Sequence, residues 1–143
     1  MIETVVIDAN VAIKWVITEE GTEQALQLRE RYHFAAPDLI LAECANILWK
    51  KVQHGQATEA LATASIEALI SSQIEIVAMD SLAKTALALS LQMQHPAYDC
   101  FYLSLALARD YRFVTADARL LRAVWRQGRA LAPRCVSLEE AVA

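Results

Sequence analysis

The stretch Thr4-Val5-Val6-Ile7-Asp8-Ala9-Asn10 decides how the chain folds. Three β-branched residues run directly into the carboxylate of Asp8, and Asn10 follows two positions later. A continuous apolar strand of this kind is typical of a position buried on both faces of a parallel sheet. Open α/β folds carry their chemistry at the carboxyl ends of such strands. Asp8 is therefore the first candidate for a functional residue.

The length and composition predict one compact domain over residues 1–143. A chain of this size buries roughly 68–70% of its unfolded surface, and 56% of its residues are hydrophobic. No apolar run reaches the roughly 18 residues that a membrane span needs, and the N-terminus lacks the pattern of a signal peptide. The three cysteines are odd in number and widely spaced, which predicts reduced thiols in a cytoplasmic protein.

The formal net charge of −4 argues against a protein that binds nucleic acid through bulk positive charge. The last third of the chain nevertheless holds seven of the 13 basic residues: Arg109, Arg112, Arg119, Arg122, Arg126, Arg129 and Arg134. One interpretation is a solvated helix face. The other is a phosphate-contacting patch, which is favoured because all seven are Arg, and Arg suits phosphate better than Lys does.

Strand and helix patterns alternate along the chain. Strands are predicted at 3–8, 34–37, 74–79, 112–115 and 135–136, with 34–37 at a sheet edge because it contains Pro37. Helices are predicted at 10–16, 19–32 (capped by Thr18 or Thr22), 38–53, 58–72, from a cap at Asp80 or Ser81 to 93, at 97–110 and at 117–127, with Ser137 capping a terminal turn. This alternation predicts a three-layer α/β/α domain with a mainly parallel sheet.

Four acidic residues stand out by their context. Asp8 and Asp117 lie near the carboxyl ends of predicted strands, Asp99 lies in the first turn of a helix, and Glu43 lies in the middle of one. Each Asp could be a helix cap or first-turn acid. Glu43 has no such explanation.

Helical spacing from Leu39 and Ile47 predicts that Glu43 faces the core. A buried carboxylate is costly unless it is paired or bound to a metal. An internal partner, such as an Arg or a backbone donor, is the alternative interpretation.

Taken together, the four acids can converge on the crevice above the sheet. Carboxylates gathered in one pocket repel one another unless cations are present. Their hard oxygen ligands suit Mg²⁺ or Mn²⁺ and not Zn²⁺. A divalent metal in such a site polarises a phosphate and activates water. The three histidines lie at linker-like positions, which predicts surface or loop roles.

Four stretches of the chain resemble the PIN-domain family and, within it, the VapC-type ribonuclease toxins of toxin–antitoxin pairs. They are V-V-I-D-A-N at 5–10, L-I-L-A-E-C-A-N at 39–46, Y-D-C-F-Y-L-S-L-A at 98–106 and F-V-T-A-D-A-R-L-L at 113–121. They follow the family's order at family-like separations, and the resemblance covers essentially the whole chain.

The resemblance implies a three-layer PIN-like fold with a five-stranded sheet, and an RNA-cleaving site that uses Mg²⁺ or Mn²⁺. Carried over by motif, Asp8 and Asp99 are the foremost metal ligands, and Glu43 and Asp117 complete the cluster directly or through water. Asn10 and Thr115 resemble polar residues that support the site. The resemblance further implies a homodimer, an RNA substrate and a cognate VapB-type antitoxin that covers the active-site groove.

Two other functions are considered. A PIN-like binding or regulatory module would have little catalysis of its own, but it would have no need to keep a repulsive cluster of four acids. A phosphatase built on Asp8 would normally carry a second acid two residues later, where this chain has Asn10. The sequence therefore favours a metal-dependent endoribonuclease whose RNA binding is sensitive to salt.

Overall fold

A sheet of five parallel strands forms the centre of the molecule. In the computed structural model, which describes residues 1–143, the sheet order is β3-β2-β1-β4-β5 and every pairing is parallel. The strands are β1 (Thr4–Ile7), β2 (His33–Pro37), β3 (Ile74–Val77), β4 (Arg112–Thr115) and β5 (Cys135–Ser137). The predicted α/β class and the predominantly parallel, five-stranded sheet are confirmed.

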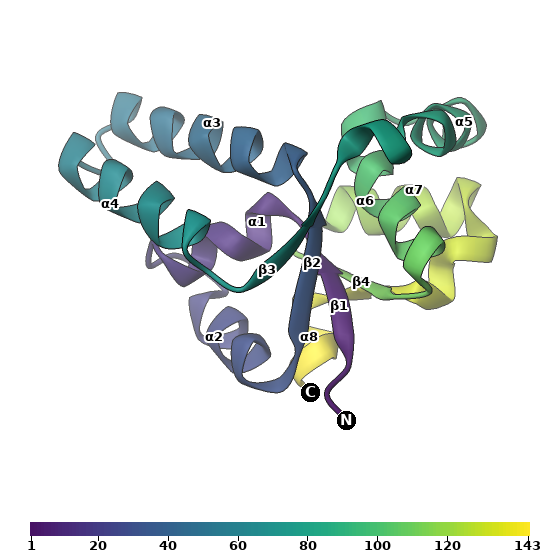
Figure 1. Cartoon of the computed structure of the whole chain (residues 1–143), viewed down its shortest axis with the longest axis horizontal. Coiled ribbons are helices and arrows are strands. Elements are labelled where there is room, and N and C mark those ends of the chain that lie inside the picture. The colour runs from purple at the N-terminus through teal and green to yellow at the C-terminus, as the bar shows by residue number, and fades with distance from the viewer.

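Helices cover both faces of this sheet, which gives the predicted three layers (Figure 1). One side carries α1 (Ala9–Ala12), α2 (Thr22–Arg31), α3 (Leu39–Gln53) and α4 (Glu59–Ile70), and the other carries α5 (Ala83–Met93), α6 (Ala97–Arg109) and α7 (Ala118–Gln127). The last helix, α8 (Leu138–Val142), packs beside α2. No helix is both long and apolar enough to cross a membrane.

The order of the strands places a switch point between β1 and β4. The chain steps from β1 to β2 and β3 in one direction, then returns across the sheet to β4 and continues to β5. Ligands of open α/β sheets bind outside the carboxyl ends of the strands at such a point. The register pairs Ile7 with Val114, so the residues that follow them, Asp8 and Thr115, lie side by side.

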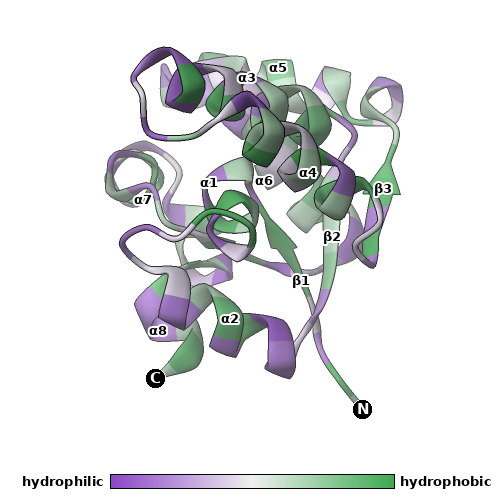
Figure 2. Cartoon of the chain, turned by 90° about the vertical axis from the view of Figure 1, so that its left-hand side faces the viewer, coloured by the Kyte–Doolittle hydropathy of each residue, from purple (hydrophilic) through white to green (hydrophobic).

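The core is built around β1, as the opening stretch of sequence predicts. Val5, Val6 and Ile7 have no exposed surface, because helices cover both sides of the strand. Figure 2 shows the hydrophobic end of β1 in the middle of the fold. Burial of Val and Ile side chains stabilises the fold by about 1.5–3 kcal/mol each. Asp8 directly follows these three residues and is buried as well.

The prediction that residues 34–37 form an edge strand is wrong. β2 lies between β3 and β1, and β3 takes the edge. Pro37 is tolerated because it is the last residue of β2. The next residue, Asp38, donates its N–H to the carbonyl of Val77 at 2.9 Å and continues the pairing.

Two predicted helix starts are also wrong, whereas two others are confirmed. The N-cap of α2 is Gly21, which has a φ of +88°, and neither Thr18 nor Thr22 caps it. Asp80 and Ser81 lie in a 3-10 turn, η2 (Met79–Ser81), and α5 begins without a side-chain cap. The helix predicted from residue 58 does start there, with Thr58 as its N-cap, and the predicted Ser137 cap of α8 is present.

Both chain termini lie at the end of the sheet where the strands begin (Figure 1). Side chains from the end of α2 hold the C-terminal residues there. Arg31 donates from Nη1 to the carbonyl of Val142 at 2.8 Å, and the Tyr32 hydroxyl donates to the carbonyl of Ala141 at 3.0 Å. The termini therefore lie at the opposite end of the sheet from the carboxyl ends of the strands.

Candidate active site

Asp8 is held rigidly at the carboxyl end of β1. The residue is only 5% exposed. Oδ1 accepts the N–H of Val11 at 3.1 Å and so caps the short helix α1, while Oδ2 accepts the hydroxyl proton of Thr115 at 2.5 Å. The cap interpretation of Asp8 is thus correct, and it leaves one lone-pair direction free on each oxygen.

Burial raises the pKa of Asp8 from 3.8 to about 7. The loss of water around the carboxylate is the largest cause, and the negative charges of Asp99 and Asp117 raise the pKa further. The hydrogen bonds from Thr115 and Val11 act in the opposite direction and lower it. Asp8 therefore lies near the balance between its two protonation states at neutral pH, where a nearby cation would favour the ionised form.

Glu43 lies half-buried on the flank of α3, which corrects the prediction that it faces the core. The buried stripe of this helix runs through Ile40, Cys44 and Leu48, and Glu43 stands beside it. Its partner is the hydroxyl of Tyr102, which donates to Oε1 at 2.5 Å. Burial raises the pKa of Glu43, the charge of Asp99 adds to the rise, and the Tyr102 hydrogen bond lowers it.

Asp99 lies in the first turn of α6, where the sequence places it, but it does not cap that helix. The N-cap residue is Pro96, which has no side chain that can accept a hydrogen bond. Asp99 instead meets His95, whose Nε2 lies 2.6 Å from Oδ2. The prediction that His95 has only a surface or loop role is therefore incomplete, because its half-buried ring orients a candidate ligand.

Asp117 lies at the N-terminus of α7 and caps it. Oδ1 accepts the N–H groups of Arg119 at 2.9 Å and Leu120 at 3.3 Å. Its own N–H donates to the Thr115 hydroxyl oxygen at 3.0 Å, which links it to the residue that holds Asp8. Asp117 therefore reaches Asp8 through Thr115 and through its charge.

One polar cavity collects three of the four acids. The acid cavity, of about 190 Å³, lies between β1, α3 and α6 and is lined by Asp8, Ala9, Asn10, Glu43, Asn46, Ile47 and Asp99. Asp117 does not line it. Asn46, one turn after Glu43 on α3, is a lining residue that the sequence reasoning did not single out, although helical spacing would have indicated it.

The donors in the acid cavity match a hard divalent cation, although they are not gathered tightly. Carboxylate and amide oxygens are the ligands that Mg²⁺ prefers. No three His, Cys, Asp or Glu side chains approach closely enough, as they stand, to hold a metal ion among them. The chemistry of the donor set fits the predicted cation, and its bound geometry would need the acids to draw together.

Tyr102 and His95 are the two partners that the sequence did not reveal. Tyr102 is 1% exposed and stacks on Phe113 of β4, with ring centroids 5.8 Å apart, so its hydroxyl is carried to Glu43 by core packing. His95 stands four residues before Asp99. A spacing of four residues can indicate a contact within a helix. Here the helix begins only at Ala97, so His95 lies outside it and the spacing did not indicate the contact.

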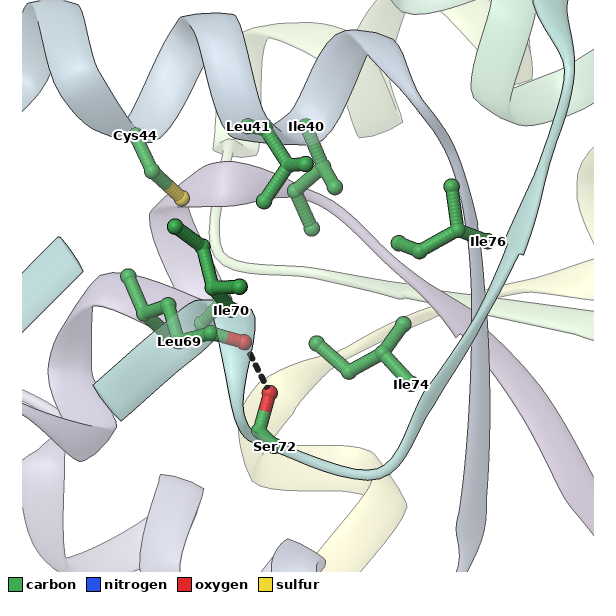
Figure 3. Close-up of a pocket in the computed structure, with 9 residues that line it drawn as sticks. Ile40, Leu41, Cys44, Leu69, Ile70, Ser72, Ile74 and Ile76 are labelled. Atoms are coloured by element: carbon green, nitrogen blue, oxygen red, sulfur yellow. Dashed lines mark hydrogen bonds between the residues drawn. The ribbon is translucent and has the colours of Figure 1, made fainter. Parts of the chain in front are cut away.

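A second cavity is apolar and offers no comparable chemistry (Figure 3). It lies between α3, α4 and β3, and eight of its nine lining residues are hydrophobic. The Ser72 hydroxyl donates to the carbonyl of Leu69 within the same segment. The Cys44 thiol is inert because burial raises its pKa to about 12. The acid cavity is therefore the candidate active site.

Comparison with known proteins agrees with this fold. A model of the PIN domain family matches residues 5–125, a range that contains all four acids. No curated protein matches the chain. The solved structure of PAE2754 from Pyrobaculum aerophilum is similar with a TM-score of 0.70 at 19% identity, over 99% of this chain and 87% of that one. A toxin–antitoxin complex from Klebsiella pneumoniae is similar with a TM-score of 0.64 at 15% identity, over 94% of this chain and 97% of that one. At these identities the two structures share the fold.

Proposed function

The chain belongs to the PIN domain family, whose members are generally nucleases, and we propose that it is a metal-dependent endoribonuclease built on residues 1–143. The observation that carries the proposal is the acid cavity. Asp8, Glu43 and Asp99 line it together, and burial raises the pKa of Asp8 to about 7, so that a nearby cation would favour its ionised form. A structural fold does not need such an arrangement, because acids that line one cavity repel one another.

Asp8 and Asp99 would hold Mg²⁺ or Mn²⁺, with Glu43 and Asp117 completing the cluster directly or through water. When bound, the metal would polarise the scissile phosphate and lower the pKa of a water molecule. Asn10, on the wall of the cavity, would offer an amide to the substrate.

The chain's own residues fix these groups. Thr115 orients Asp8, and Tyr102 orients Glu43. His95 donates from Nε2 to an ionised Asp99, because a carboxylate can only accept. Partners of this kind, behind the ligands themselves, are worth 10–100-fold in metal affinity or activity (roughly).

We further propose that the nuclease is the toxin of a type II toxin–antitoxin pair. The motif resemblance to VapC-type toxins supports this role, as does the likeness in fold to a protein solved in a toxin–antitoxin complex. The partners would then be an RNA substrate, a VapB-type antitoxin and a second copy of the chain. The site of action would be the cytoplasm.

The loose spacing of the acids favours one second candidate, a PIN-like binding or regulatory module. Such a module would keep the fold and have little catalysis, and no three acids are close enough as they stand to hold a metal. Cleavage assays separate the two functions.

We expect the purified protein to cut single-stranded RNA in the presence of Mg²⁺ or Mn²⁺, and we expect EDTA to abolish this cleavage. Asp8→Asn should lower the rate by more than about 100-fold, since even residues that only support a metal ligand are worth 10–100-fold. Asp80→Asn, at an exposed position on η2, is the matched control and should keep wild-type activity. An Asp8→Asn protein that cuts as fast as wild type would contradict the mechanism, and a wild-type protein that does not cut would favour the module.

A further inference from the structure

A second polar cavity, of about 330 Å³, lies on α7 beside the active site. Three arginines line it, Arg119, Arg122 and Arg126, together with His95 from the loop before α6. They occupy positions i, i+3 and i+7 of α7, so they share one face of the helix. We call these three residues the arginine track.

The arginine track differs from the other arginines in the last third of the chain. Three of those form salt bridges with carboxylates: Arg109 with Glu75, Arg112 with Glu3 and Arg134 with Asp110. Arg129 lies over the ring of Trp125, at 5.5 Å from its centroid. The three track residues are exposed and form no salt bridge, and no carboxylate lines their cavity. Their charge is available to an anion from outside the chain.

The arginine track begins at the active site. His95 lines the track cavity and contacts Asp99, which lines the acid cavity, so one pair of side chains separates the two. At the start of α7, Asp117 accepts the backbone N–H of Arg119. The seven residues from Arg119 to Arg126 then rise about 10 Å along the helix, away from the acids.

We propose that the arginine track binds the phosphodiester backbone of single-stranded RNA on one side of the scissile bond. This inference rests on the proposed nuclease function and names the surface by which that site holds its substrate. A polyanion is repelled by the acids where it is cut, so its binding needs cations next to them. The guanidinium fork matches phosphate oxygens, and backbone contacts of this kind position a strand without reading its sequence.

An acidic protein segment is the other class of ligand that three arginines could bind. The lining does not favour it, because only Met93 and Ala123 are apolar. A helix that docks in a groove does so through a row of apolar anchors. RNA also accounts for the position of the track, since the strand that enters the acid cavity has to leave it.

The test compares two double variants of the full chain that remove the same charge. Arg122→Gln/Arg126→Gln removes two residues of the track. Arg29→Gln/Arg129→Gln is the control, because each of its arginines lies over a Trp ring and neither lines the track cavity. All four positions are exposed, and thermal melting checks that both variants fold.

The readouts are binding and cleavage of one fluorescent RNA strand of roughly 12 nucleotides. Anisotropy in EDTA, from about 50 to 200 mM salt, gives Kd and its salt dependence. We expect the track variant to weaken binding by at least 10-fold (roughly) at low salt, and its slope of log affinity against log salt to be shallower by about 0.7 for each lost phosphate contact. In Mg²⁺ its KM should rise with kcat little changed. The control variant should keep the wild-type slope and KM.

The outcomes separate this inference from the proposed function. If wild type cuts the RNA and the track variant keeps its Kd, slope and KM, the RNA track is overturned, and an acidic protein segment remains as the ligand class. If Asp8→Asn cuts normally while the track variant loses affinity, the mechanism fails and the track stands. If wild type neither binds nor cuts RNA, both are overturned.

Discussion

Asp8 caps α1, and in the proposed function the same carboxylate also binds the metal, although the sequence presented these two roles as alternatives. Oδ1 caps α1 through Val11, and Oδ2 accepts from Thr115. The cap contributes about 0.5–2 kcal/mol, which is less than burial of the charge costs. Burial of the Asp8 charge destabilises the fold, and the same burial raises the pKa of Asp8, so that a nearby cation would shift it towards the ionised form. Stability and function are therefore opposed at this residue.

The raised pKa of Asp8 predicts how stability depends on pH. In the unfolded chain Asp8 titrates near 3.8, and in the folded chain near 7. Between these values the folded state binds more protons, so the free energy of unfolding falls as pH rises from about 4 to about 7. Asp8→Asn removes this loss, since the amide can still accept from Val11 and can donate to the Thr115 oxygen. In EDTA at pH 8 we expect Asp8→Asn to be the more stable protein, by about 4 kcal/mol at the most.

Urea unfolding in EDTA at pH 5 and at pH 8 measures this effect. The increase in the free energy of unfolding caused by Asp8→Asn should be larger at pH 8 than at pH 5. Asp80→Asn should give no such difference. Equal gains at the two pH values would show that Asp8 ionises as freely in the fold as it does in water.

Among the elements, the strands that carry Asp8 and Asp117 could be predicted from the sequence, whereas partners on different helices could not. The hydrophobic run before Asp8 and the Phe-Val-Thr run before Asp117 placed β1 and β4 correctly, because both signals are local. The hydrogen bond from Tyr102 to Glu43 joins residues 59 positions apart. It depends on where the sheet places α3 and α6 relative to each other, which no local pattern specifies. The interior position of β2 was missed for the same reason, since strand order is set by the crossovers.

At the start of α7, two substitutions of Asp117 separate its capping role from its charge. Asn caps a helix about as well as Asp does, whereas Ala costs about 1 kcal/mol. We expect Asp117→Asn to keep wild-type stability within about 0.5 kcal/mol and Asp117→Ala to lose about 1 kcal/mol. Both should cut RNA more slowly, because both lack the carboxylate. Denaturant unfolding and initial cleavage rates, measured on the same samples, give the two quantities.

Full activity in Asp117→Asn together with reduced stability in Asp117→Ala would limit Asp117 to capping. That result would remove it from the catalytic cluster and leave Asp8, Glu43 and Asp99 as the acids of the site.

At the scale of the whole molecule, the acids come to one side of the fold only because the sheet is complete. Residues 8, 43, 99 and 117 follow β1, β2, the start of α6 and β4, and the strand order brings these points to one edge. An unfolded chain has no such cluster. A cation that bridges these residues would therefore bind the native state and not the unfolded one.

Thermal unfolding in Mn²⁺ tests this coupling. A ligand at 100 times its Kd stabilises the native state by about 2.7 kcal/mol. The Tm of wild type should therefore rise as the Mn²⁺ concentration is raised above its Kd. Asp8→Asn should show a much smaller rise, and Asp80→Asn should match wild type. An equal rise in wild type and Asp8→Asn would place the cation elsewhere on the surface, and no rise in wild type would favour the non-catalytic module.

The positions of the two termini have a practical consequence for handling this protein. Arg31 and Tyr32 fasten the last residues at the edge where β1 begins, away from the acid cavity. Anything joined to either end, such as a fluorophore, an affinity handle or a surface tether, leaves the molecule on that side. The protein can therefore be immobilised through either terminus on a sensor chip with the acid cavity facing the flowing solution.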